Sequence, residues 1–181
     1  MAERFRLSLW QSLWQRVYRG FDDLLSPWRS LDEGPAAASL PPSAWILYRR
    51  MARADRRHSL RLWHWLRRHG YDDPDLLAAA LLHDCGKAAA SLRVWHRTLK
   101  VLLRRLAPVR WQRLAAPAPP GHWRYPFFVL EHHPRLGAEW AAAAGCSALT
   151  VWLIAHHESR PDPADPRTAL MILLQAADAA S

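Results

Sequence analysis

Apolar residues recur along this chain at spacings of three and four, and no stretch alternates with period two for long enough to form a strand. The pattern is clearest over residues 4–28, where one apolar stripe consists of Leu7, Trp10, Trp14, Val17, Phe21, Leu24 and Trp28. The chain is therefore predicted to be all-α. Further helices are predicted over 44–70 (as one helix or two), 73–86, 91–106, 134–145, 147–158 and 167–180.

Glycine, proline and capping residues predict where these helices begin and end. Glycines and prolines interrupt the periodicity over 30–43, which is predicted to be a linker between an N-terminal amphipathic helix (1–29) and a helical domain (44–181). Within that domain Asp73 is expected to cap a helix, with Pro74 in its first turn. The other expected boundaries are helix ends at Gly70, Gly86 and Gly145 and helix starts at Ser91, Pro134 and Ser147.

The composition narrows the kinds of partner and compartment. The formal net charge of +9 favours anionic partners such as nucleotides, nucleic acid or acidic lipid, but no specific nucleic-acid motif accompanies it. The two cysteines, Cys85 and Cys146, have no metal-type spacing and are interpreted as small hydrophobic residues in a reducing compartment. No run reaches the ~18 apolar residues of a membrane span, and the N-terminus does not have the pattern of a signal peptide. The expected location is the cytoplasm.

Histidine and aspartate residues at or near the ends of the predicted helices form the main functional candidate. Helices that meet at their ends can bring such residues to one point, and the candidates are His58, His83, Asp84, His133, His156, His157 and Asp178. Imidazole and carboxylate ligands suit Mn or Fe best, with Ni, Co, Zn or Mg as alternatives. One aspartate can bridge two such cations, which is the usual arrangement for hydrolysis of phosphoesters.

A structural interpretation competes with the metal site. A single His-Asp pair more often forms a buried hydrogen bond than a metal site, and Asp178 alone could be a solvated residue. His132 stands beside His133 but in a weaker position. The remaining histidines have no carboxylate nearby in the sequence and are interpreted as surface or packing residues; they are His64, His69, His96 and His122.

Four short motifs then suggest a family. His58, the pair His83-Asp84 and Asp178 follow the H…HD…D order of the HD-domain metal-dependent phosphohydrolase superfamily, and "HDCGK" (83–87) resembles its signature. The segments "HHPRLGAEW" (132–140) and "HHES" (156–159) are similar to motifs of the HD-GYP branch. The resemblance covers residues 58–178 and implies an all-helical bundle that binds metal in its interior.

The resemblance also implies roles for individual residues. Ligands of a first metal would be His58, His83, Asp84 and Asp178, and ligands of a second would be His133, His156 and His157. Asp84 would bridge the two metals, and Lys87 would face the substrate phosphate. Because Ala54 stands where three-metal members have a glutamate, two divalent metals are expected. The Gly-Tyr-Pro tripeptide of the HD-GYP branch is missing after "HHES", so little hydrolysis of cyclic di-GMP is expected.

The function expected from these residues is metal-dependent hydrolysis of a phosphomonoester or phosphodiester of the nucleotide type. Asp84 and Lys87 are the expected catalytic residues, and Arg97 is a weaker candidate for a phosphate contact. Two alternatives stay open, because the same ligands could hold two irons that activate oxygen, or the domain could bind a nucleotide or a protein partner without turnover. His133, placed before the expected helix start at Pro134, should be neutral near pH 7 because the positive end of a helix dipole disfavours imidazolium.

The predicted N-terminal helix has an apolar stripe too large to leave in water. Packing on its own domain, a homodimer and contact with an acidic membrane surface are the three candidates for covering it. Its polar face carries Asp22 and Asp23 beside arginines, which disfavours the membrane. Packing against protein is therefore expected.

Overall fold

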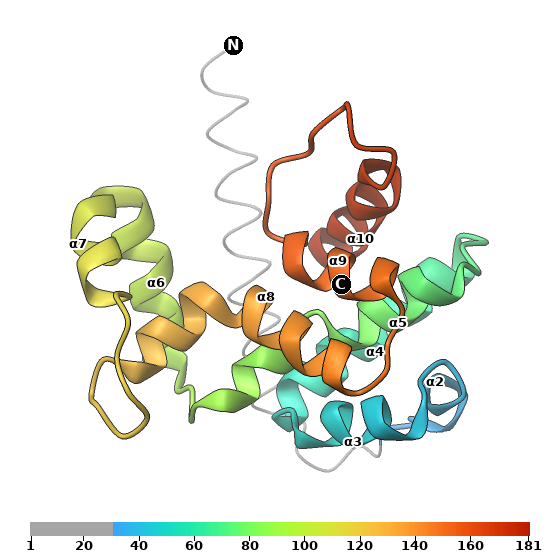
Figure 1. Cartoon of the computed structure of the whole chain (residues 1–181), viewed down its shortest axis with the longest axis horizontal. Helices are drawn as coiled ribbons and strands as arrows, with labels where there is room; N and C mark the ends of the chain where they lie inside the picture. The colour runs from blue at the N-terminus through green and yellow to red at the C-terminus, as the bar shows by residue number, and fades with distance from the viewer. Residues whose placement is uncertain (1–30) are drawn as a thin grey trace. The chain divides into compact units, whose positions relative to one another are not determined.

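Helices supply all the regular structure of residues 31–181, the part of the chain that this computed structural model describes (Figure 1). They are α2 (Gly34–Ala37), α3 (Pro42–Arg50), α4 (Arg53–Arg68), α5 (Pro74–Leu82), the 3₁₀ helix η1 (Cys85–Ala89), α6 (Val94–Leu106), α7 (Pro108–Leu114), α8 (Tyr125–Ala143), α9 (Ala148–His156) and α10 (Thr168–Ala180). The predicted all-α class is confirmed for these residues. The amphipathic helix predicted at 4–28 lies outside them. Within this described part, none of the helices has the length and apolarity needed to cross a bilayer.

The central helix is α5, which is buried on every side. Each residue from Leu76 to Leu82 is at most 6% exposed, and α3, α4, α9 and α10 all contact this helix. Complete burial explains why its sequence is apolar all round instead of along one stripe. Because α5 ends inside the bundle, the two residues that follow it, His83 and Asp84, are also buried.

Several predicted helix boundaries are confirmed. The side chains of Asp73 and Ser147 each accept a hydrogen bond from the backbone N–H three residues later, at 2.9 and 3.0 Å, and so cap α5 and α9. Gly70 and Gly145 follow the ends of α4 and α8 with φ of 80° and 79°, which only glycine adopts without strain. Of the two cysteines, Cys85 is buried and Cys146 is half-buried, and both are free thiols.

The stretch predicted as a linker, 30–43, is partly helical and packs against the helical domain. It contains α2, and its Ala36 and Leu40 are buried. The side chain of Ser39 accepts a hydrogen bond from Trp63 Nε1 at 3.1 Å, which fastens this stretch to α4. Prolines at 35 and 42 stand in the first turns of α2 and α3, where a missing N–H costs nothing.

Three other expected boundaries are wrong, and the choice between one helix and two over 44–70 is now decided. Residues 44–70 form two helices, because Met51 and Ala52 are extended with ψ of 150° and 147°. Ser91 does not cap α6, which begins at Val94 with Arg93 as its N-cap. Pro134 does not start a helix, because α8 has already begun at Tyr125 and runs through it. Gly86 does not end α5; it lies inside η1.

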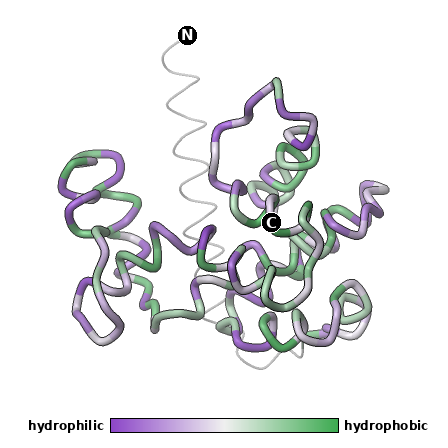
Figure 2. Tube along the Cα trace, viewed as in Figure 1, coloured by the Kyte–Doolittle hydropathy of each residue, from purple (hydrophilic) through white to green (hydrophobic). Residues whose placement is uncertain are grey.

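A smaller apolar cluster joins α6 and α7 to α8. Its buried residues are Trp111, Ala115, Phe127 and Leu130, with Leu92, Leu99, Leu103 and Leu114 packed against them. Figure 2 shows that α6 and α7 carry strongly hydrophobic and strongly hydrophilic residues in close succession. This pair of helices therefore has one face for packing and another face that it leaves open.

Candidate metal centre

Asp84 stands at the centre of a buried group of histidines. Two sets of residues each place their ligand atoms within 4.8 Å of one another, and Asp84 belongs to both; the sets are His58, His83, Asp84 and Asp84, His133, His157. Asp84, His83, His133 and His157 are all less than 9% exposed. Buried His/Asp groups of this composition could hold metal ions.

Close packing of η1 against α8 brings the parts of this site together. A Cβ atom on Gly86 would lie 2.2 Å from the backbone oxygen of His133 and 2.7 Å from the nitrogen of Gly137. Only a residue without a side chain allows the two backbones to approach this closely. The glycine of "HDCGK" therefore serves to set Asp84 beside His133, and it does not serve as the helix stop that was predicted.

The three buried histidines are held in the same way. In each, Nδ1 lies within hydrogen-bonding distance of the backbone oxygen three residues earlier: His83 at 3.0 Å, His133 at 3.0 Å and His157 at 2.8 Å. A carbonyl oxygen can only accept, so Nδ1 must carry the proton. In the neutral ring Nε2 is then left with its lone pair.

Helix ends and one proline free the carbonyls that hold these rings. The carbonyls of Ala80 and Ile154 belong to the last turns of α5 and α9, where the helix supplies no partner. The carbonyl of Leu130 lies in mid-helix, but Pro134, four residues on, has no N–H to offer it. Pro134 therefore leaves the Leu130 oxygen available for His133.

The free Nε2 atoms face the carboxylate of Asp84. The Nε2 to carboxylate distances are 3.5 Å for His83, 3.2 Å for His133 and 3.9 Å for His157. His133 Nε2 is buried and has no hydrogen-bond partner among the described residues. Lone pairs that face a carboxylate at these distances repel it unless a cation lies between them, so the donor set fits a metal.

At His133 and His157 a proton does not supply that cation near neutral pH. Burial lowers the pKa of His133 below its ordinary value and lowers the pKa of His157 to about 3. His133 was expected to be neutral, and the direction of its shift agrees with this. The expected cause was wrong, because the ring lies inside α8 and not at a helix start.

Lys87 is paired with Asp84 inside the same site. Its Nζ lies 2.6 Å from Asp84 Oδ2, with the side chains 17% and 6% exposed. Burial opposes both charges, but the pair holds the pKa of Asp84 well below its usual range and raises the pKa of Lys87. Lys87 is thus a fixed positive charge beside the candidate ligands.

Asp178 is near the site and is bound to another candidate ligand. Its Oδ1 lies 2.8 Å from His58 Nε2. Desolvation acts to raise the pKa of Asp178, but the hydrogen bond from His58 and the charges of His83 and His58 together outweigh it and lower the value to about 2. Both carboxylate and imidazole are partly exposed at the edge of the bundle, and either could turn toward a metal.

The structure does not bring two of the predicted residues into the group. His156 stacks on Trp152, with ring centroids 4.4 Å apart, and its Nδ1 lies 2.8 Å from the Trp152 oxygen. Arg97 is engaged by Asp55, whose two oxygens lie 2.8 and 3.0 Å from one guanidinium nitrogen. Arg97 therefore neutralises a buried carboxylate next to Lys87 and is not an unpaired phosphate ligand.

Lys100, Glu158 and Asp55 also border the group, and the sequence analysis did not select them. Lys100 Nζ lies 2.9 Å from the Leu130 oxygen and 3.1 Å from Glu158 Oε1, which is itself 3.8 Å from His133 Nε2. The sequence did distinguish Lys100, because Lys87 and Lys100 are the only lysines of an arginine-rich chain. Asp55 precedes His58 by three residues and so shares its helix face.

Comparison of the chain with protein-family models, with curated proteins and with solved structures found no match. The class defined by fold and site is therefore broad. Over the described residues, this is an all-helical protein with a buried His/Asp group that could bind metal.

Proposed function

We propose that this protein is a metal-dependent phosphohydrolase of the HD-domain type. The observation that carries the proposal is the position of Asp84, whose carboxylate is shared by two sets of imidazole ligands. A single carboxylate common to two sets is what a pair of metals needs in order to lie close together. A structural His-Asp pair would need one histidine, whereas here three Nε2 atoms face Asp84 within 3.9 Å.

The chemistry expected of such a pair is well defined. Two divalent metals, Mn or Fe by preference, lower the pKa of a water and offset the charge of a phosphoryl group. Together with Asp84, residues His58, His83 and Asp178 would hold one metal of that pair, and His133 and His157 would hold the other. The backbone carbonyls behind three of these rings keep each Nε2 directed at Asp84.

Lys87 supplies the positive charge that a phosphate requires. Its ammonium is largely buried, and Asp84 and Asp55 keep it protonated. In a site of low polarity, such a fixed charge stabilises developing negative charge strongly. The substrate class proposed is a phosphomonoester or phosphodiester of the nucleotide type, with cyclic di-GMP disfavoured because the Gly-Tyr-Pro tripeptide is missing.

The test is turnover by the metal-loaded protein. Purified full-length chain is supplied with Mn(II) or Fe(II) and assayed with bis(p-nitrophenyl) phosphate, p-nitrophenyl phosphate and cyclic di-GMP. Hydrolysis of one of the first two is expected, and Lys87→Met should reduce it more than about 30-fold without loss of bound metal. The control is Arg135→Gln, an exposed cation of α8 that pairs with Glu139 and whose loss should change the rate less than about threefold.

Other outcomes would refute the proposal in specific ways. Metal-dependent oxygen consumption by the iron form, with no phosphoester turnover, would indicate the di-iron alternative. Nucleotide binding without turnover by any metal form would indicate a binding domain. Rapid conversion of cyclic di-GMP to a linear product would show that the missing tripeptide has been given too much weight.

A further inference from the structure

The charge of this chain is concentrated in one segment. Residues 85–130 contain nine lysines and arginines and no acidic residue, while the rest of the chain carries equal numbers of acidic and basic residues. The whole formal net charge of +9 therefore resides in η1, α6, α7 and the start of α8. A segment with this balance attracts anions over a distance of several ångströms.

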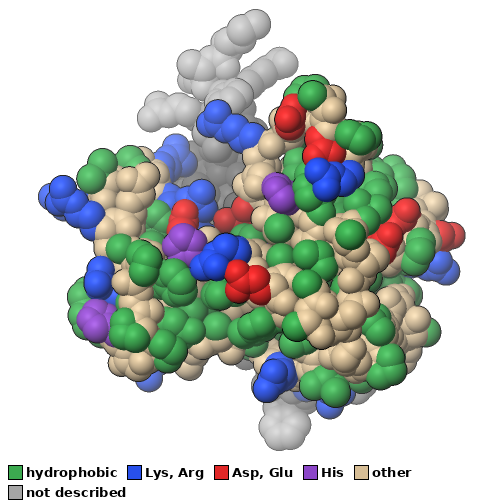
Figure 3. All heavy atoms as spheres, viewed as in Figure 1, with side chains coloured by type: hydrophobic (Ala, Val, Ile, Leu, Met, Phe, Trp, Pro, Cys, Tyr) green, Lys and Arg blue, Asp and Glu red, His purple; other side chains and the backbone are tan. Residues whose placement is uncertain are grey.

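The same segment exposes more large apolar side chains than any other part of the described chain. One side of α6, defined here as the α6 outer face, consists of Val94, Trp95, Val101, Leu102 and Leu106. Their exposed fractions run from 50% to 71%. Figure 3 shows hydrophobic and basic side chains side by side over α6 and α7.

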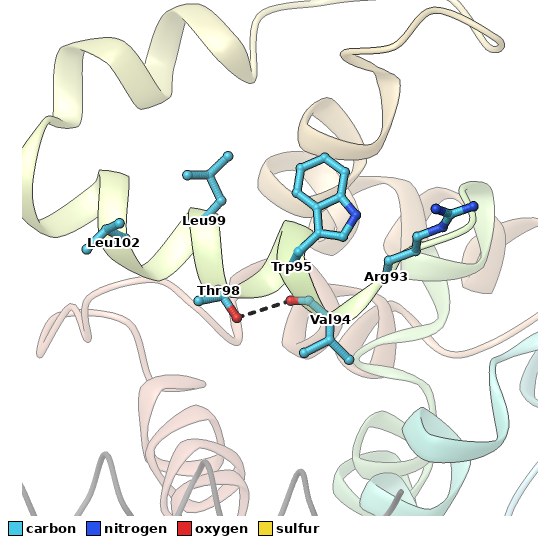
Figure 4. A pocket seen from close by; sticks show the side chains of 6 residues that line it. All are labelled: Arg93, Val94, Trp95, Thr98, Leu99 and Leu102. Atoms are coloured by element: carbon cyan, nitrogen blue, oxygen red, sulfur yellow. Dashed lines mark hydrogen bonds between the residues drawn. The ribbon is translucent and has the colours of Figure 1, made fainter.

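The two sides of α6 have different partners. Leu99 and Leu103 pack inward against the small apolar cluster, and Lys100 reaches Leu130 and Glu158 beside the candidate metal centre. The outer face borders a shallow groove lined by Arg93, Val94, Trp95, Thr98, Leu99 and Leu102 (Figure 4). None of these lining residues belongs to the candidate metal centre, and no residue from 31–181 outside α6 and its N-cap lines the groove.

Unpaired arginines accompany the outer face. Arg105 lies one turn after Val101 and Leu102, which places it within that face. Arg110 and Arg113 follow on α7, where Val109 is also exposed. Over the described residues, the side chains of Arg105, Arg110 and Arg113 form no ion pair, so their charge is available to a ligand.

We propose that the α6 outer face binds a membrane surface that contains anionic phospholipid. Tryptophan and aliphatic side chains enter the boundary between headgroups and acyl chains, and flanking arginines contact lipid phosphates while their stems stay apolar. The combination of an exposed apolar face with unpaired arginines is what such a surface requires. This inference does not depend on the proposed hydrolysis.

The charge pattern disfavours the other occupants. A second copy that pairs through this face in a two-fold interface would set two basic segments against each other. Nucleic acid would be attracted by the arginines, but exposed valine and leucine side chains offer it neither hydrogen bonds nor stacking surfaces. An anionic lipid surface satisfies both the charge and the apolar side chains.

The experiment is sedimentation of the full-length chain with vesicles. One set contains phosphatidylcholine with about one quarter phosphatidylglycerol, and the other contains phosphatidylcholine alone. The chain should bind the first set at least about tenfold more tightly than the second, and salt should weaken the binding. Leu102→Glu with Leu106→Glu should reduce binding more than about tenfold, and Arg105→Gln should reduce it about fivefold.

Matched controls distinguish binding by this face from nonspecific binding by other exposed apolar residues. Ile46→Glu on α3 and Ile172→Glu on α10 change apolar residues that are 61% and 47% exposed, and these variants should bind vesicles as the wild type does. Circular dichroism confirms that each variant is folded. A further variant, Trp10→Glu with Trp14→Glu, reports on the N-terminal apolar stripe and should also retain binding.

Each contrary result would overturn the proposal. Wild type that does not sediment with anionic vesicles, or that binds neutral vesicles equally well, has no such surface. Binding that survives Leu102→Glu with Leu106→Glu but is lost in the Trp10 and Trp14 variant belongs to the N-terminal stripe. If the wild type is a dimer in solution and the variant Leu102→Glu with Leu106→Glu is a monomer, the occupant of this face is a second copy of the chain. If the wild type binds duplex DNA but no vesicles, and Arg105→Gln does not bind the DNA, the occupant is nucleic acid.

Discussion

The candidate metal centre, called the centre below, and the α6 outer face depart in opposite directions from the usual pattern, in which polar groups are exposed and apolar groups are buried. At the centre, a carboxylate, an ammonium and three imidazoles are withdrawn from water, and glycines let the backbones approach closely. At the outer face, valine, leucine and tryptophan side chains remain in water beside unpaired arginines. Helix α6 contacts both regions, since Arg97, Lys100 and Arg104 lie beside carboxylates that border the centre.

Each departure costs folding free energy and so indicates a binding partner. Buried charges and unpaired lone pairs are unfavourable until a cation arrives, and exposed apolar area is unfavourable until a surface covers it. The difference lies in rigidity. Hydrogen bonds and close packing fix the side chains of the centre, whereas the side chains of the outer face are half or more exposed. Substitutions should therefore damage the centre far more than the face.

Among the substitutions considered, Gly86→Ala should cause the largest loss of unfolding free energy relative to its control. The Cβ of Gly86→Ala would meet backbone atoms of α8 at 2.2 and 2.7 Å, and a backbone cannot move aside as a side chain can. The variant should lose at least about 3 kcal/mol of unfolding free energy, measured by urea denaturation of the metal-free protein. Gly121→Ala is the control, because φ is 87° there but no atom lies within 4 Å of the new Cβ. It should cost only about 1–2 kcal/mol, and equal losses would contradict the close packing described here.

Two adjacent histidines test which ring belongs to the centre. His157 Nε2 faces Asp84 at 3.9 Å, whereas His156 stacks on Trp152. His157→Ala should lower metal-dependent phosphoesterase activity more than about 100-fold, and His156→Ala should change it less than about threefold. The assay is initial rate at saturating metal. Equal losses in both variants would restore His156 to the ligand set.

The unfolding free energy should depend on pH because of a histidine at the centre, and residues of the outer face should not contribute to that dependence. In the folded metal-free protein burial lowers the pKa of His157 from 6.5 to about 3. Between these values the unfolded chain binds a proton that the folded chain does not, so the unfolding free energy falls as the pH falls. The slope is about 1.4 kcal/mol per pH unit for each such histidine.

Urea denaturation of the metal-free protein between about pH 7 and pH 5 measures this slope, a range that lies above the titration of most carboxyl groups. His157→Gln should reduce the slope, because a glutamine does not titrate. Leu106→Ala on the outer face should leave it unchanged. A wild-type stability that stays constant over this range would show that the buried histidines are protonated in the folded state.

Substitutions at the outer face should change the unfolding free energy least. Leu106 is 71% exposed, so Leu106→Ala should change the unfolding free energy by less than about 0.5 kcal/mol. Leu62 is fully buried in α4, and Leu62→Ala should cost about 2–5 kcal/mol. Urea midpoints of the two variants give the comparison. A large loss in Leu106→Ala would mean that this face packs against protein.

Local chemistry is what the sequence could predict. Asp73 and Ser147 cap helices through their own side chains and nearby N–H groups, so their roles follow from a few consecutive residues. The candidate ligands His83 and Asp84 could be selected because they follow an apolar helix and lie within a short motif. The all-α class followed from spacing alone.

Contacts between distant segments account for what the sequence did not predict. Pro134 is tolerated inside α8 because the carbonyl of Leu130, which it leaves without a helical partner, accepts hydrogen bonds from the ring of His133 and from Lys100, thirty residues before Leu130. Arg97 pairs with Asp55 forty-two residues earlier, which no local pattern encodes. The choice between His156 and His157 depends on where α9 ends, and one residue turns a side chain by about 100°.

The most direct test of the account is metal content per chain. Wild type, Asp84→Asn and the exposed control Asp72→Asn are supplied with manganese or iron, dialysed without chelator and analysed for elements. Wild type and Asp72→Asn should retain about two transition-metal ions per chain. Asp84→Asn should lose both, because Asp84 belongs to both ligand sets. Wild type without metal, or Asp84→Asn with the wild-type amount, would contradict the two-metal centre.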